Sequence, residues 1–250
     1  MGVEPLVNLL YAELLKLRRS AMLLISTIGA SVVPFMVVVA SYVQIKTENP
    51  APVIKFHELF SNANLYTVLV VGVPLYGVVA AYIFNREYMD DTLKNLLTIP
   101  VSRINLILSK LLLLFIWIFF LTLVAWGLTL LLGVILQFPG LSQSLILKSF
   151  LHFAIGGVLL FVLSTPIVLI TVVLKNYVPT IIFTILITLI NIMTANSEHR
   201  GLFPWAAAGD ISMNTLLSTY PPEYSYLGIA LVSIVGFVSL IIYFNKVDIH

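Results

Sequence analysis

The chain has 250 residues, of which 60% are hydrophobic and 10% are charged, and its net charge is +2. Ordinary soluble domains carry about 25% charged residues, so this composition excludes a soluble globular protein. The chain has no cysteine, which excludes disulfides, thiolate metal sites and thiol catalysis.

Long uncharged apolar runs predict an all-α polytopic membrane protein, because about 20 helical residues cross a hydrocarbon core of roughly 30 Å. We expect a single transmembrane domain over residues 1–250. Pro34, Pro74 and Pro166 interrupt spans, and neighbouring helices are expected to supply the lost hydrogen bonds. Only Lys175 and Asn176 separate the fourth and fifth spans, which predicts a tight helical hairpin. The six predicted spans are residues 21–44, 64–84, 104–136, 149–174, 177–195 and 226–244.

Six spans place both termini on the same side of the membrane. Basic residues near span ends face the cytoplasm more often than the exterior, and their distribution here predicts cytoplasmic termini. The nine basic residues assigned to that side are Lys16, Arg18, Arg19, Arg86, Lys94, Arg103, Lys110, Lys175 and Lys246, against Lys46, Lys55, Lys148 and Arg200 outside.

The segment between the second and third spans, "NREYMDDTLKNLLTIPVSR", combines charges with a leucine stripe. Its four central charges would together cost roughly 10–14 kcal/mol in the hydrocarbon, so it lies outside the membrane. The spacing of Met89, Leu93, Leu96 and Leu97 predicts a short amphipathic helix. Asp90 or Asp91 can cap the start of this helix, Pro100 ends it, and Ser102 can cap the third span.

Periodicity alone also fits a helix on the membrane surface, with its leucines on lipid. The three acids between Glu87 and Asp91 argue against that alternative, because the inner leaflet is anionic. We therefore interpret the segment as a contact surface for a cytosolic partner.

The same segment resembles the first cytoplasmic loop of type-2 ABC exporter permeases. It departs from the family pattern at Asp91, where many members carry glycine, so a tight glycine turn is not expected. The residues that match the pattern are Arg86, Glu87, Tyr88, Thr92, Leu93, Lys94, Leu96, Leu97, Thr98, Pro100, Ser102, Arg103 and Lys110.

Two further stretches extend the resemblance. "YAELLKLRRS" is similar to the family's N-terminal interfacial helix, with Glu13, Lys16, Arg18 and Arg19 as its charged residues, although Glu13 interrupts its apolar stripe. The alternative interpretation is a basic flank that orients the first span. Chain length and "FPWAAAGD", residues 203–210, most resemble permeases of bacitracin-export and lantibiotic-immunity systems.

The resemblance implies a permease subunit in a bacterial cytoplasmic membrane that exports an amphiphilic antimicrobial peptide or another hydrophobic substrate. It also implies two separate ATPase subunits that bind ATP and Mg, and a second permease, identical or related. The chain has no Gly-x-x-x-x-Gly-Lys-Ser/Thr loop, so it cannot hold the nucleotide that way itself. For a subunit driven by a partner's ATP we expect no cofactor and no enzymatic activity in this chain, and no nucleic-acid partner. The residues implied in ATPase coupling are Glu87, Tyr88, Asp90, Asp91, Thr92, Leu93, Lys94, Leu96, Leu97, Pro100 and Arg103.

Two other functions stay open on the sequence: a membrane scaffold or sensor that recruits a cytosolic ATPase without transport, and a secondary transporter. An ion-driven transporter usually carries ionisable groups at mid-membrane, and none of the spans has an Asp, Glu, Lys or Arg near its centre. The four histidines lack the spacing of a zinc site.

The last outer segment, residues 196–225, is too apolar for a free loop and too broken for a span. It predicts short re-entrant or interfacial helices, with Trp205 and Tyr220 as interface anchors. Phe203, Pro204 and Trp205 are candidates for an outer gate. The alternative is a lid that only covers the bundle.

Overall fold

The computed structural model describes residues 4–18, 20–50, 52–89 and 102–246, and these residues contain helices but no strand. A π-helical turn at Thr67–Val71 joins the third helix to the fourth, and a 3-10 turn at Arg200–Leu202 precedes the tenth. The helices are α1 (Glu4–Arg18), α2 (Met22–Thr47), α3 (Phe56–Tyr66), α4 (Gly72–Met89), α6 (Arg103–Ile135), α7 (Gln143–Val162), α8 (Thr165–Leu174), α9 (Tyr177–Thr194), α10 (Pro204–Met213) and α11 (Pro222–Lys246).

Six helical segments are long and apolar enough to cross a membrane, which confirms the predicted number. The second begins at Phe56 and the fourth at Gln143, both earlier than predicted. The first turns of these helices carry polar residues such as His57 and Lys148, which a search for apolar runs leaves out. The six segments are Met22–Thr47, Phe56–Arg86, Arg103–Ile135, Gln143–Leu174, Tyr177–Thr194 and Pro222–Lys246.

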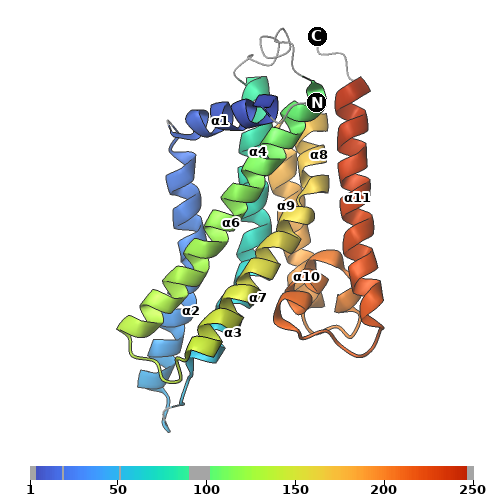
Figure 1. The fold of residues 1–250 in the computed structure, drawn as a ribbon. Helices are drawn as coiled ribbons and strands as arrows, with labels where there is room; N and C mark the ends of the chain where they lie inside the picture. The colour runs from blue at the N-terminus through green and yellow to red at the C-terminus, as the bar shows by residue number, and fades with distance from the viewer. Residues whose placement is uncertain (1–3, 19, 51, 90–101, 247–250) are drawn as a thin grey trace.

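Helix α1 lies across one end of the bundle, where α11 also ends, and α3 and α10 lie at the opposite end (Figure 1). We call these the α1 end and the α10 end. The spans run between them, and the short helix α1 is oriented across their axes as an interfacial helix would be.

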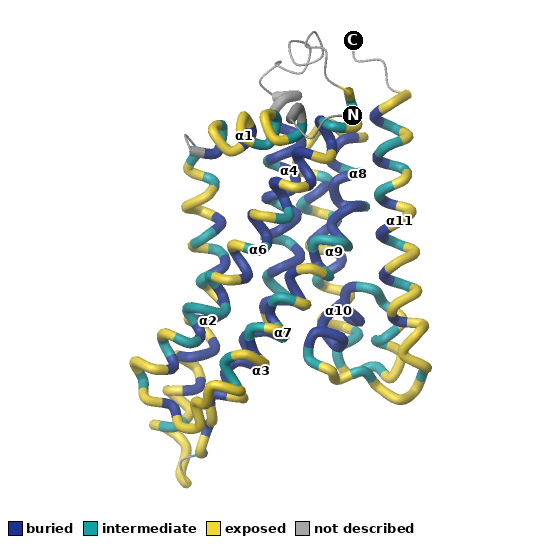
Figure 2. Tube along the Cα trace, viewed as in Figure 1, coloured by how far each residue is buried: buried dark blue, intermediate teal, exposed yellow. Residues whose placement is uncertain are grey.

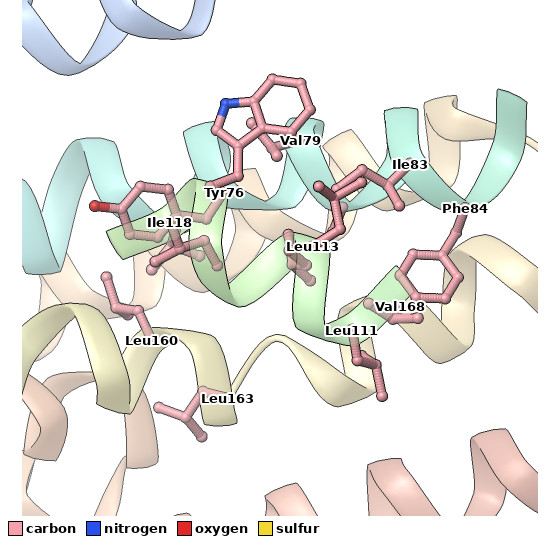
Figure 3. Packing of buried hydrophobic residues seen from close by; sticks show 14 of the residues in the cluster. Tyr76, Val79, Ile83, Phe84, Leu111, Leu113, Ile118, Leu160, Leu163 and Val168 are labelled. Carbon is pink, nitrogen blue, oxygen red and sulfur yellow. The ribbon is translucent and has the colours of Figure 1, made fainter. Parts of the chain in front are cut away.

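The core forms where α4, α6 and α8 meet. Val79, Leu113, Leu163 and Val168 are fully enclosed there, and Figure 3 shows them packed with their neighbours. Helices α2, α9 and α11 carry large exposed apolar side chains. Figure 2 colours the exposed residues along α2 and α11 yellow. Such side chains suit contact with lipid, where close packing and buried polar contacts hold the helices together.

The π turn before Pro74 shows how a neighbouring helix replaces a lost hydrogen bond. Gly72 donates its N–H to the carbonyl of Thr67, five residues earlier, as π geometry requires. In the same register the carbonyl of Leu69 would face Pro74, which has no N–H. Asn191 of α9 donates to that carbonyl from Nδ2 at 3.0 Å, as expected from the sequence.

The predicted tight hairpin between the fourth and fifth spans is confirmed. Lys175 ends α8 in the left-handed region, with φ at 50°, and the side chain of Asn176 accepts a hydrogen bond from the N–H of Val178 to cap α9. The left-handed residue reverses the chain within two positions.

Gly236 of α11 packs directly against the first turn of α8. A Cβ atom there would lie 2.7 Å from the backbone nitrogen of Pro166, whereas a Cβ at Gly127 of α6 would meet nothing within 4 Å. We expect Gly236→Ala to cost about 1–3 kcal/mol of folding free energy through overpacking. Gly127→Ala is the matched control and should be neutral or stabilising. Thermal unfolding in detergent measures both, and equal melting temperatures would contradict this packing.

Candidate functional site

Glu13 is a buried acid at the centre of the α1 end, only 5% exposed. It lies on the same side of α1 as Leu17, which packs into the core. Three cations surround its carboxylate: Lys16 Nζ at 2.7 Å, Arg86 Nη2 at 3.3 Å and Lys110 Nζ at 3.5 Å. We call Glu13, Lys16, Arg86 and Lys110 the Glu13 cluster.

Lys110 of α6 contacts both α1 and α4 in the Glu13 cluster. Its side chain reaches inward from α6, and the residue is only 2% exposed. Besides its ion pair with Glu13, Nζ donates a hydrogen bond to the carbonyl of Ile83 in α4 at 3.1 Å. The lysine therefore links α1, α4 and α6 at one point.

Arg86 extends the cluster to the turn between α1 and α2. Its guanidinium lies 5.5 Å from the centre of the Tyr82 ring, a cation–π distance. The Tyr82 hydroxyl donates to Ser20 Oγ at 2.8 Å, and Ser20 Oγ also accepts from the N–H of Met22 at 3.0 Å. The end of α4 is thus connected to the start of the first span.

The charge balance of the Glu13 cluster is one anion to three cations. Burial alone would raise the pKa of Glu13, but Lys110, Lys16 and Arg86 together lower the pKa below its usual value. The carboxylate is therefore ionised at neutral pH. Removing one partner of a buried ion pair costs about 3–5 kcal/mol because the other charge is left uncompensated.

The position of the cluster determines what it can do. Helix α4 leads into residues 90–101, and α6 begins just after them. Both helix ends are held to α1 through the Glu13 carboxylate. A force applied to residues 90–101 would therefore pass to α1 and, through Ser20, to the first span.

Comparison with known proteins decides the family. The sequence pattern of the ABC-2 family transporter proteins matches residues 9–191 of the chain. The bacitracin transport permease BCRB of Bacillus licheniformis is 55% identical over 205 residues, which cover 82% of this chain and 99% of that protein. The chain belongs to the ABC-2 transporter family.

Most of the predicted ATPase-coupling residues of this ABC-2 permease lie outside the described residues. Glu87 and Tyr88 are in the last turns of α4. Arg103 starts α6 and donates to the backbone carbonyls of Phe244 and Asn245 at 3.2 and 3.5 Å, so it holds the last turn of α11. The residues outside the described ranges are Asp90, Asp91, Thr92, Leu93, Lys94, Leu96, Leu97 and Pro100.

The N-terminal helix of the ABC-2 permease is present as α1. Of its predicted charged residues, the structure brings Glu13 and Lys16 together, Arg18 ends α1, and Arg19 lies outside the described residues. Glu13 interrupts the apolar stripe because it points to the cations of α4 and α6. A lone acid on the apolar side of a basic helix is the sequence signal for such a buried pair.

The outer segment forms the short helices that the sequence predicted. Pro204 begins α10, and the rings of Phe203 and Trp205 lie 5.5 Å apart. Trp205 is only 6% exposed and packs in the core, so its predicted role as an interface anchor is wrong. Helix α10 packs against α7 and α11, and the indole is buried within the protein.

An ion pair closes the outer segment on itself. Arg200 contacts Asp210 through Nε at 2.9 Å and Nη2 at 2.8 Å, a two-point contact between guanidinium and carboxylate. Burial raises the pKa of Asp210, and Arg200 opposes that rise. The described residues contain no group of three or more His, Asp and Glu side chains able to hold a metal ion.

Proposed function

We propose that the chain is the permease subunit of an ATP-driven exporter that removes bacitracin or a similar amphiphilic antimicrobial peptide from the cytoplasmic membrane. The observation that carries this proposal is the 55% identity to a bacitracin transport permease over 99% of that protein's length. Loss of such a subunit would leave the cell sensitive to the peptide.

The α1 end is the cytoplasmic side of the permease, and both termini are cytoplasmic. The distribution of basic residues supports this orientation, because they gather at cytoplasmic span ends. The described basic residues of the α1 end are Lys16, Arg18, Arg86, Arg103, Lys110, Lys175 and Lys246, against Lys46, Lys55, Lys148 and Arg200 at the α10 end.

Two ATPase subunits bind ATP and Mg and dock against residues 90–101 from the cytosol, and a second permease completes the transport path. The leucines and acids of that segment supply apolar anchors and polar contacts to the ATPase. The Glu13 cluster then carries the motion of the docked ATPase from α4 and α6 to α1.

Vesicles with the permease and its ATPase subunits reconstituted together test this function. We expect fluorescent bacitracin to accumulate only when ATP is supplied on the side of the ATPase. A variant of the ATPase that lacks its P-loop lysine is the control. A complex that hydrolyses ATP without moving peptide would instead indicate a scaffold or sensor, and accumulation driven by an ion gradient would indicate a secondary transporter.

A further inference from the structure

A cavity of about 740 Å³ opens at the α10 end, between the first turns of α3, the first half of α7 and the residue that follows α10. Its lining combines polar and apolar side chains. No acidic side chain is among the described residues that line it. This combination distinguishes the cavity from the purely apolar groove beside α2, which is lined by Val33, Met36 and Val37.

Three basic side chains line the cavity: His57 from α3, and Lys148 and His152 from α7. Lys148 and His152 are four residues apart on one helix, so they share a face, and α3 packs against that helix. Among the described residues, none of the three side chains makes a hydrogen bond or an ion pair. A lysine that has no counterion beside an apolar wall offers its charge to a ligand.

The first turn of α7 adds neutral donors to the same wall. The hydroxyls of Ser142 and Ser144 lie 3.1 Å apart and both line the cavity, and Ser142 also caps α7 by accepting from the N–H of Leu145. Because the N-terminus of a 20-residue helix carries a partial positive charge, it strengthens the attraction for an anion. A lysine, two histidines, hydroxyls and a helix start together offer several hydrogen-bond donors to the oxygens of a phosphate.

The apolar lining of the cavity continues onto the exposed surface of α7. Leu151 and Ile155 line the cavity, and their exposed fractions are 48% and 40%, respectively. A free phosphate would make no use of these side chains. An amphiphile could place its head beside Lys148 and the two histidines and its chain along the two apolar residues, as in basic pockets that bind lipid headgroups between membrane helices.

We propose that this cavity binds the phosphate headgroup of a lipid, with the acyl chain against Leu151 and Ile155. The inference rests on the proposed function for its membrane side, because the α10 end is then the outer leaflet. The exporter would thereby engage a phosphate-bearing lipid beside its peptide substrate. His57, Lys148 and His152 bind the headgroup, and α7 provides the surface along which the chain lies.

Binding to the full complex in a non-ionic detergent, without ATP, tests the site by calorimetry. We expect dioctanoyl phosphatidic acid to bind, and both dioctanoylglycerol and inorganic phosphate to bind at least tenfold more weakly. The double variant Lys148→Gln, His152→Gln should weaken binding of phosphatidic acid at least tenfold. Lys46→Gln, an exposed lysine of α2 at the same end, is the matched control and should bind like the wild type.

Each contrary result identifies a different error. Equal binding of dioctanoylglycerol would show that the cavity recognises only apolar chains, and equal binding of inorganic phosphate would show a site for the free anion. If the double variant melts like the wild type and binds phosphatidic acid with unchanged affinity, Lys148 and His152 do not bind the headgroup and the proposal is wrong. Peptide transport is measured separately, so failure of the lipid site leaves the proposed function intact, and the reverse also holds.

Discussion

Replacing Glu13 with glutamine is expected to reduce ATP-driven peptide transport at least tenfold while the ATPase stays bound and hydrolyses ATP. The amide keeps the shape of the side chain but removes the only anion of the Glu13 cluster. The buried ammonium of Lys110 then loses its ion pair with Glu13, and breaking a buried pair costs about 3–5 kcal/mol. The ion pairs that join helix α1 to α4 and α6 are lost, so less of the motion of residues 90–101 reaches α1 and the first span. Transport and ATP hydrolysis are measured on the same vesicles.

Two comparisons separate coupling from general damage. Glu48→Gln makes the same chemical change at an exposed position beyond α2 and should leave transport unchanged. Lys110→Met, added to Glu13→Gln, removes the buried cation that faces the new amide and should restore much of the melting temperature but not the coupling. A Glu13→Gln permease with wild-type stability and transport would show that the cluster does not transmit force.

The spans were predictable because each one is a continuous run of apolar residues in the sequence. Six runs were correct in number and order, and the errors fell at helix starts such as Phe56, where polar first turns extend beyond the apolar run. The two-residue hairpin after α8 and the Ser102 cap of α6 were also correct, since both depend on residues that are neighbours in the chain. Local rules suffice for such features.

The partners of buried charges could not be predicted in the same way. The sequence placed Lys110 on a cytoplasmic stem among the basic residues that set orientation, but the structure buries it. Its counterion, Glu13, is almost a hundred positions away along the chain, and only the crossing of α1 over α6 brings the two together. A charge count records such a lysine but not its surroundings.

The outer segment shows the same limit for an aromatic residue. Tryptophan is enriched at membrane interfaces, which made Trp205 a reasonable anchor. Its burial depends on how α10 packs against α7 and α11, and no local pattern encodes that contact. The cavity beside α7 is a further case, because His57 and His152 come from helices that are distant in the sequence.

The double substitution Leu96→Asp, Leu97→Asp is expected to abolish association with the ATPase. Both residues lie outside the described part of the chain, and the prediction rests on their place in the amphipathic pattern of the segment. Burying two leucines in an interface contributes about 1.5–3 kcal/mol each, so their loss weakens binding at least roughly a hundredfold. The new carboxylates add a desolvation cost at the same contact. Co-purification of the ATPase with the tagged permease measures the effect.

The matched control makes the same change at the other end of the molecule. Leu141 and Leu217 are exposed leucines of the α10 end, and replacing both with aspartate should leave ATPase association at the wild-type level. Since Glu13→Gln is expected to keep the ATPase bound and lose only transport, the two sets of variants separate docking from transmission. If the ATPase co-purifies normally with the Leu96→Asp, Leu97→Asp permease, residues 90–101 are not the docking surface. The proposed transmission of motion from the ATPase to the Glu13 cluster would then also be wrong.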